Sequence, residues 1–227
     1  MLFRSDLHAE DLSRDVETLV NLVRNIANLT LEDGLAFDGS SASGVVIRDE
    51  DEYSGVRVSL TAKLASANVA LHVDVNVGDP ISPAPQEISL PRLLGAPVAL
   101  RGYPMEMVHA EKIVTAVSRG TANTRWRDFG DVYSLSGLHA IEGDDLLKSL
   151  SAVASHRQVD LIPLSVTLEG YAAIAQTRYT TWRRKQQRDD LPEEFQIVLE
   201  RVFAFSYPAL AGSVSGMAWN PFTLSWD

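Results

Sequence analysis

The sequence predicts an α+β protein in which a β-sheet with one N-terminal helix comes first and a bundle of helices follows. Apolar and other residues alternate through residues 69–77, as in a strand that buries one face. From residue 103 onward, apolar residues recur instead at helical spacing between turn-forming residues. We therefore expect an α/β domain over residues 1–100 and a helical C-terminal domain over residues 101–227.

The N-terminal part is predicted to begin with a short strand over residues 2–8 and a helix over residues 13–29. Apolar residues recur every three or four positions in the helix. Ser13 is the expected N-cap, and Asp15 and Glu17 stand in the first turn, where the helix dipole favours acidic side chains.

Three further strands are expected over residues 45–47, 55–60 and 69–77, and a short one over residues 87–90. In the strand over residues 69–77, Leu71, Val73, Val75 and Val77 point to one face, and His72, Asp74 and Asn76 point to the other. This pattern allows two interpretations of Asp74. It is either a carboxylate placed for chemistry or an acidic residue that faces solvent from a half-exposed sheet.

The second half is predicted to be helical, with Pro163, Pro192 and Pro208 separating its segments. The acidic residues around Pro192 suit a helix start. The tail over residues 211–227 shows no period, and we expect it to dock as a loop. The predicted helices cover residues 103–118, 124–137, 142–155, 167–188 and 192–205.

Composition restricts the possible functions. The 227 residues are 45% hydrophobic, enough for a substantial core. Cysteine is absent, which rules out thiolate chemistry and disulfides and suits a reducing cytosol. No stretch looks like a signal peptide or a membrane span, so we expect a cytoplasmic protein without a membrane partner. The formal net charge of −10 argues against broad, non-specific nucleic-acid binding.

A local basic segment over residues 178–188 has five cations and two aromatic residues. This mixture suits phosphate contact and base stacking, with Arg183, Arg184 and Lys185 as candidate RNA-binding residues. The alternative is a solvated amphipathic helix whose Trp182 packs inward.

Lys112 is the most informative single residue. It lies in an apolar helical stretch, where a lysine needs a partner or a function. Asp128 and Asp131 are three residues apart, so they share one face of the next predicted helix and can meet Lys112 across the helix pair. A nucleotide-handling site and a purely structural ion pair both fit this spacing.

The chain resembles the AbiEii/AbiGii family of nucleotidyltransferase toxins, which includes the MenT toxins. The resemblance covers residue 4 to about residue 210. In the family, a Y-P-x-E-x-x-x-A-E-K segment is followed by N-S-R-x-K-D-x-x-D-L, and here Thr124 stands for the serine and Arg127 for the lysine. The residues that carry it are Tyr103-Pro104, Ala110-Glu111-Lys112 and Asn123-Thr124-Arg125-Trp126-Arg127-Asp128-Phe129-Gly130-Asp131-Val132-Tyr133.

The resemblance implies a mixed β-sheet of the nucleotidyltransferase type and a Mg²⁺-dependent transfer of a nucleoside monophosphate from an NTP to RNA, in MenT-like members the 3′ end of tRNA. It also implies a cognate antitoxin as a protein partner. Such sheets hold Mg²⁺ with carboxylates. By this resemblance, Asp6 and Asp74 bind the metal, and Asp74 accepts the proton of the attacking hydroxyl.

The same resemblance assigns the remaining site residues. Lys112 binds the triphosphate as a point charge. Asp131, together with Asp128, orients Lys112 or the nucleotide. Arg57 contacts phosphate, and Ser5 lies at the nucleotide, where it is also a candidate for self-modification.

The chain departs from the family pattern at its first strand, which normally carries a D-x-D pair reached from a Gly-Ser turn that cradles phosphate. Asp6 matches the second acidic position, but Arg4 occupies the first, and no Gly-Ser turn precedes it. Three explanations stay open. The true start lies upstream, the gene is naturally shortened and its activity attenuated, or another acid such as Glu10 or Asp11 completes the site.

Two other functions are compatible with the sequence. A nucleotidyltransferase-like protein that has lost its first metal carboxylate could bind only nucleotide, RNA or an antitoxin. A metal-dependent hydrolase could use His72, His109 and carboxylates, although the five histidines show no close ligand spacing.

Overall fold

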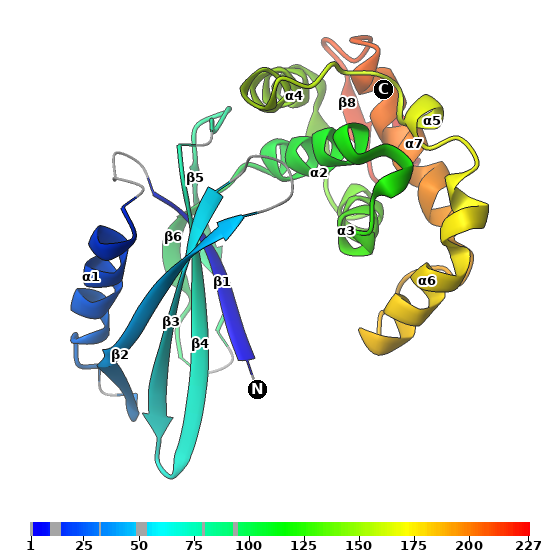
Figure 1. The fold of residues 1–227 in the computed structure, drawn as a ribbon. Coiled ribbons are helices and arrows are strands. Elements are labelled where there is room, and N and C mark those ends of the chain that lie inside the picture. The colour runs from blue at the N-terminus through cyan, green and yellow to red at the C-terminus, as the bar shows by residue number, and fades with distance from the viewer. Residues whose placement is uncertain (1, 10–14, 32, 49–53, 79, 93–94) are drawn as a thin grey trace. The chain divides into compact units, whose positions relative to one another are not determined.

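The computed structural model describes residues 2–9, 15–31, 33–48, 54–78, 80–92 and 95–227, and of residues 2–9, 48 and 54 it describes the backbone alone (Figure 1). The chain forms two compact units, Met1–Asp79 and Pro80–Asp227, called here the sheet unit and the helical unit. None of the helices in the described part of the chain is long and apolar enough to cross a membrane.

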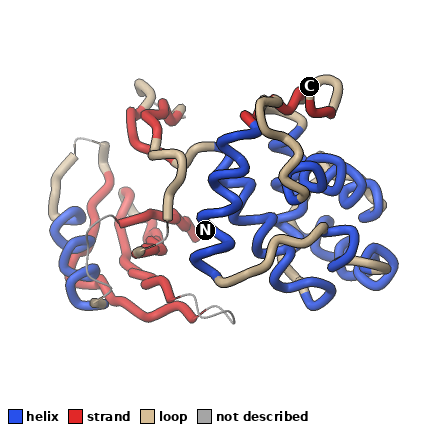
Figure 2. Tube along the Cα trace, turned by 90° about the horizontal axis from the view of Figure 1, so that it is seen from above, coloured by secondary structure: helices blue, strands red, loops and turns tan. Residues whose placement is uncertain are grey.

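The sheet unit contains one helix and a four-stranded sheet in the order β1-β4-β3-β2. Strand β1 runs parallel to β4, whereas β3 is antiparallel to both β4 and β2, so the predicted mixed sheet is confirmed. The helix contacts β2 and β3 and lies beside the strands in Figure 2. The elements are β1 (Leu2–Ala9), α1 (Val16–Ala27), β2 (Leu35–Arg48), β3 (Ser54–Leu64) and β4 (Ala67–Val77).

Helix α1 begins later than the sequence predicts. Asp15, not Ser13, is its N-cap, because the Asp15 Oδ2 atom accepts a hydrogen bond of 2.8 Å from the Thr18 backbone N–H. This bond satisfies one of the free amides of the first turn and lowers the pKa of the Asp15 carboxyl. Ser13 itself lies outside the described residues.

The core of the sheet unit lies between α1 and one face of the sheet. Leu19 and Val20 of the helix pack with Val56 and Val58 of β3 and Val75 of β4. On β4, Leu71, Val73, Val75 and Val77 all belong to this cluster or pack against it, as the alternation predicts. Asp74 is on the other face, yet it is only 7% exposed, so the solvent-facing reading of this residue is wrong.

Because α1 packs closely on β2, adding a side chain at Gly44 should destabilise the protein. A Cβ atom at Gly44 would lie 2.6 Å from Val16 Cγ1 and from Val20 Cγ2, which is too close for an unshifted contact. We expect Gly44→Ala to lower the free energy of unfolding by about 1–3 kcal/mol. Chemical denaturation measures this loss, and Ala36→Val at an exposed position of the same strand is the control. Equal stability of both variants would contradict the packing.

The first strands of the helical unit, β5 (Gln86–Leu90) and β6 (Val98–Gly102), form a hairpin. The strand over residues 98–102 is not among the predicted elements. The residues before the hairpin belong to this unit as well, since Ile81 packs on its core and Ser149 Oγ donates a hydrogen bond to the Ser82 carbonyl oxygen. The boundary at residue 79 therefore lies before the hairpin, whereas the sequence placed it at residue 100.

The five predicted helices are present, with shifted ends. The helix expected over residues 167–188 begins only at Tyr171, because Gly170 adopts a left-handed conformation with φ of 70°, and Thr167 ends a separate short helix. The last helix continues through Pro208, which lies in its final turn, where a missing N–H removes a single helical hydrogen bond. The elements are α2 (Met105–Arg119), η1 (Gly120–Ala122), α3 (Trp126–Ser136), α4 (Gly143–Arg157), α5 (Leu164–Thr167), α6 (Tyr171–Lys185) and α7 (Phe195–Leu210).

The C-terminal tail is not a loop, contrary to the prediction. Strands β8 (Ala218–Asn220) and β9 (Ser225–Trp226) form a hairpin, and β8 also pairs with β7 (Ile141–Glu142). The Trp219 indole N–H donates to the Ser136 carbonyl oxygen at 2.7 Å, and its ring packs edge-on against Phe205. The tail is thus part of the core of the helical unit.

Candidate functional site

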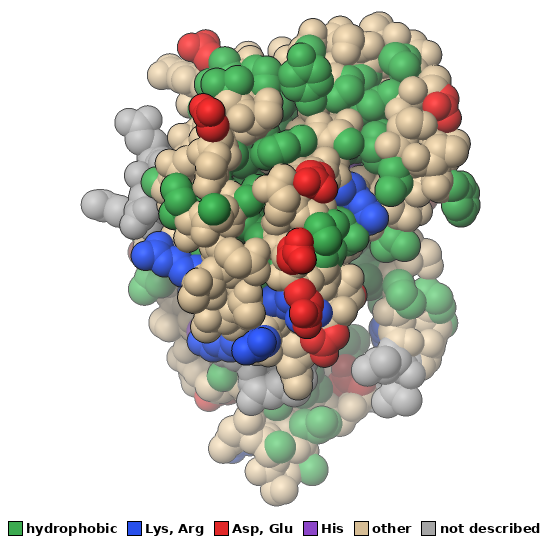
Figure 3. All heavy atoms as spheres, turned by 90° about the vertical axis from the view of Figure 1, so that its right-hand side faces the viewer, with side chains coloured by type: hydrophobic (Ala, Val, Ile, Leu, Met, Phe, Trp, Pro, Cys, Tyr) green, Lys and Arg blue, Asp and Glu red, His purple; other side chains and the backbone are tan. Residues whose placement is uncertain are grey.

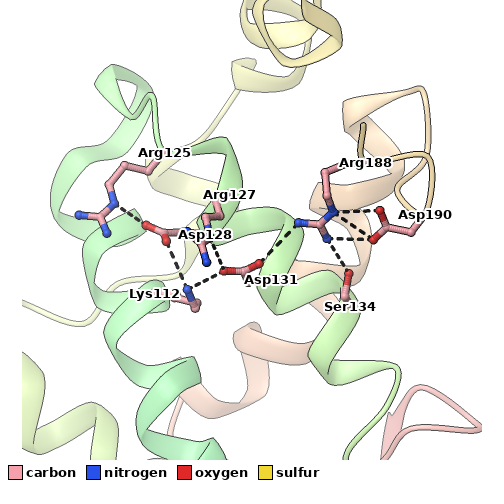
Figure 4. A network of polar contacts seen from close by, with 8 residues as sticks. All are labelled: Lys112, Arg125, Arg127, Asp128, Asp131, Ser134, Arg188 and Asp190. Atoms are coloured by element: carbon pink, nitrogen blue, oxygen red, sulfur yellow. Dashed lines mark hydrogen bonds and ion pairs between the residues drawn. The ribbon is translucent and has the colours of Figure 1, made fainter. Parts of the chain in front are cut away.

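Lys112 lies on α2, whose other face supplies much of the helical core, including Ile113 and Val114. Its side chain is 19% exposed. The Nζ atom is 2.9 Å from Asp131 Oδ2 and 3.4 Å from Asp128 Oδ1 on α3. The predicted meeting of Lys112 with these two carboxylates across a helix pair is therefore present in the structure (Figure 4).

Helix α3 presents the two carboxylates because its opposite face is anchored in an aromatic cluster. Phe129 and Trp126 pack on Phe195 edge to face, and Trp126 stacks on Tyr171. At the start of the helix, the Asn123 side-chain oxygen accepts a hydrogen bond of 2.7 Å from the Arg125 N–H. This packing fixes the direction in which Asp128 and Asp131 leave the helix.

Each of the two carboxylates also contacts an arginine. Neither of these contacts is predicted by the sequence. Arg125 Nε is 2.6 Å from Asp128 Oδ2, and Arg188 Nη1 is 3.7 Å from Asp131 Oδ1. Arg127 Nε is 3.6 Å from Asp131 Oδ2, but its side chain is 73% exposed.

Together with Asp190, which pairs with Arg188, the group contains four cationic and three anionic side chains. It therefore keeps one net positive charge, a property that favours a phosphate ligand.

The second polar group lies on the sheet unit. Arg57 of β3 is the register partner of Asp74 on β4. The guanidinium donates from Nε to Asp74 Oδ1 at 2.7 Å and from Nη2 to Oδ2 at 2.8 Å. This bidentate geometry is the strong form of an arginine–carboxylate pair. Arg57, expected to contact phosphate, instead binds the carboxylate expected to hold the metal.

Strand β1 brings the Asp6 backbone next to Asp74. Asp6 and Asp74 are partners in the parallel β1–β4 ladder, and Ser5 pairs with Val73 and Arg4 with His72. The Asp6 and Ser5 side chains lie outside the described residues, as do Glu10 and Asp11.

The donor set can be compared with what Mg²⁺ requires. Carboxylate oxygens are suitable ligands, and Asp74 supplies two of them, but Arg57 occupies both. Among the residues with described side chains, no three histidine or acidic side chains gather as a metal site. Asp74 fits as one ligand, and because Arg57 uses one lone pair of each oxygen, a metal would compete with the guanidinium or share the carboxylate with it.

The basic segment at the end of α6 divides into buried and exposed parts. Trp182 packs against the helical core, as the amphipathic-helix reading predicts. Arg183 is only 11% exposed and donates from Nε to the Leu191 carbonyl oxygen at 2.8 Å. Arg184 and Lys185 are exposed. Of the three candidate RNA-binding residues, Arg183 thus serves the fold as well.

Arg183 and Arg184 also line an open cavity of about 520 Å³ between α6 and the start of α7. Glu193 and Glu194 share its wall, so its charge is mixed. Figure 3 shows acidic and basic side chains next to one another on the side of the helical unit that carries α5 and α6.

The two histidines considered for a hydrolase site have other surroundings. His72 Nδ1 is 2.8 Å from Ser59 Oγ on the neighbouring strand. His109 is fully buried on α2 and packs against the Phe205 ring at 4.6 Å between centroids. The described acidic and histidine side chains form no cluster around either of them.

Burial of His109 predicts a pH-dependent stability. Burial lowers the pKa of His109 to about 3, with a further contribution from the charge of Lys112. Between pH 6.5 and pH 3 the unfolded chain binds a proton at this residue and the folded chain does not, so stability falls as the pH falls. The loss from pH 7 to pH 5 is about 2 kcal/mol.

His109→Leu should remove this part of the pH dependence. Urea unfolding at pH 7 and pH 5 would measure it for both proteins. An equal loss in wild type and variant would show that His109 is charged in the folded state or exposed.

The mixed sheet followed by helices is consistent with a nucleotidyltransferase-like α+β fold. The family model described as "Nucleotidyl transferase AbiEii toxin, Type IV TA system" matches residues 6–201, most of the chain. The chain belongs to this family of nucleotidyltransferase toxins, so a nucleotide substrate and an antitoxin partner follow. Comparisons with curated proteins and with solved structures gave no significant match.

Proposed function

We propose that this protein transfers a nucleoside monophosphate from an NTP to RNA, with the 3′ end of tRNA as the acceptor, as in MenT-like toxins. The observation that carries the proposal is the Lys112 group, in which a partly buried ammonium is fixed by Asp131 and Asp128 within a net positive cluster. A positioned cation of this kind can bind the triphosphate and stabilise charge on the departing pyrophosphate.

The reaction forms one bond and breaks one. The acceptor hydroxyl oxygen bonds to the α-phosphorus of the NTP, and the bond between that phosphorus and the oxygen that bridges it to the β-phosphate breaks. Pyrophosphate leaves with the electron pair. Asp74, in this proposal, takes the proton of the hydroxyl.

Asp6 and Asp74 would hold Mg²⁺, whose chemistry there is to neutralise phosphate charge and lower the pKa of the attacking hydroxyl. Because Arg57 binds both Asp74 oxygens, the metal would bind Asp74 more readily if the guanidinium moved to another anion. The triphosphate is a suitable new partner, since arginine recognises phosphate and carboxylate through the same donor fork.

For the RNA, we propose contacts to Arg184 and Lys185, the exposed cations at the end of α6, with Arg183 fixing the segment beside them. An overall negative protein needs such a local contact surface to approach a polyanion. We further propose that the protein acts in the cytoplasm, where NTPs and tRNA are available.

A second candidate function is binding without transfer. The bidentate Arg57–Asp74 pair favours it, because a carboxylate satisfied by arginine has no need of a metal. Arg4, which stands in place of the first carboxylate of the family pattern, also favours binding without transfer.

Incubation with each α-labelled NTP, Mg²⁺ and tRNA separates these functions. Label on tRNA supports transfer, and NTP binding by calorimetry without label on RNA supports the binding-only protein.

A further inference from the structure

Arg188 is an arginine of the Lys112 group that contacts residues on both sides of it. It lies between α6 and α7, and its side chain is 25% exposed. Nε lies 2.9 Å from Asp190 Oδ1 and Nη2 lies 2.9 Å from Asp190 Oδ2, so the fork is engaged bidentately. Nη2 also donates to Ser134 Oγ on α3 at 3.3 Å. Figure 4 shows Asp131 between this guanidinium and Lys112.

The two oxygens of Asp131 are thereby divided between two cations. Oδ2 accepts from Lys112 Nζ at 2.9 Å, and Oδ1 faces Arg188 Nη1 at 3.7 Å. The contact of Oδ1 with Arg188 is an ion pair longer than a hydrogen bond, and its attraction favours the orientation of Asp131 in which Oδ2 meets Lys112. Arg188 thus limits the positions that Asp131, and through it the Lys112 ammonium, can occupy.

Arg188 also adjusts the charge around Lys112. Two carboxylates beside one ammonium would give a local excess of negative charge, which repels a triphosphate. Arg188 partly offsets the charge of Asp131, since it shares its own charge between Asp131 at 3.7 Å and Asp190 at 2.9 Å. Arg125, by contrast, contacts Asp128 at 2.6 Å. Arg127, the other cation near Asp131, is 73% exposed and is screened by solvent.

We propose that Arg188 is a positioning residue for nucleotide binding: it holds Asp131 so that Lys112 stays in one place and keeps its positive charge available to the triphosphate. The inference rests on the proposed function in that Lys112 is taken as the triphosphate ligand. Arg188 itself makes no contact with substrate in this account.

The first test needs no activity. The sequence has four lysines, so the ammonium ¹H–¹⁵N spectrum is simple, and Lys112→Ala assigns the Lys112 signal. A hydrogen-bonded ammonium exchanges its protons slowly enough to be seen. We expect a Lys112 signal in the wild type that broadens or disappears in Arg188→Gln. Lys148→Gln, which removes a cation from a surface pair with Asp145, should leave it unchanged.

The second test uses kinetics. Arg188→Gln should raise KM for the NTP about tenfold and change kcat much less, because a positioning residue acts on ligand binding. Arg188→Lys keeps the charge but not the bidentate fork, so it should give an intermediate KM. Thermal unfolding of each variant shows whether it is folded.

The proposal is overturned if folded Arg188→Gln retains both the wild-type Lys112 signal and the wild-type KM. If the wild type neither binds nor turns over any NTP, the proposed function has failed, and the Lys112 signal alone then decides whether Arg188 positions this lysine. A lost signal supports the positioning role, and a retained signal refutes it.

Discussion

Replacing Lys112 with alanine is expected to lower the rate of nucleotide transfer by about a hundredfold or more, the usual effect of removing a positioned group that stabilises transition-state charge. The reason is specific to this site. Lys112 is the ammonium that both Asp128 and Asp131 orient, and the nearby arginines are already engaged with those carboxylates. Initial rates with labelled NTP measure the loss, and growth of cells that express each variant gives a second readout.

Lys148→Ala is the matched control for this experiment. Lys148 lies on a helix of the same unit, and its pair with Asp145 is exposed, so its removal should change neither rate nor growth. If Lys112→Ala and Lys148→Ala behave alike while both remain folded, Lys112 is a structural ion-pair partner and nothing more.

Removing Arg57 is expected to have two linked effects on the sheet unit. Arg57→Gln leaves the buried Asp74 carboxylate without its bidentate partner, which should cost about 2 kcal/mol of stability in the presence of a chelator. The same change removes the guanidinium from the Asp74 oxygens, so that a cation can take its place beside them. Millimolar Mg²⁺ should therefore raise the melting temperature of Arg57→Gln more than that of the wild type.

The double variant Arg57→Gln with Asp74→Asn supplies the control. It lacks both the guanidinium and the carboxylate charge, so its melting temperature should not respond to Mg²⁺. Equal Mg²⁺ responses in Arg57→Gln and the double variant would contradict the assignment of Asp74 as a metal ligand.

Sequence patterns correctly predict several local features of this fold. The alternation on β4 correctly separated the face of Val75 from that of Asp74, because a strand places successive side chains on opposite faces. Likewise, Asp128 and Asp131 meet Lys112 as their spacing predicts, because three residues make nearly one helical turn.

Features that depend on tertiary contacts were harder to predict. Arg188 follows α6 and reaches Asp131 on α3, and no periodicity connects the two. The tail was expected to be a loop because strands of two or three residues, such as β8 and β9, are too short to show alternation. Alternation alone does not predict whether Asp74 is buried, because its pairing with Arg57 is set by strand register.

Nucleotide transfer to tRNA is tested most directly by the mass of intact tRNA after incubation with the protein, Mg²⁺ and each NTP in turn. We expect a gain of one nucleoside monophosphate, or of several in succession, with at least one NTP. The added nucleotide should be located at the 3′ end by nuclease digestion and should be absent with Lys112→Ala. An unchanged tRNA mass with all four NTPs, from protein that still binds NTP by calorimetry, would contradict transfer to tRNA.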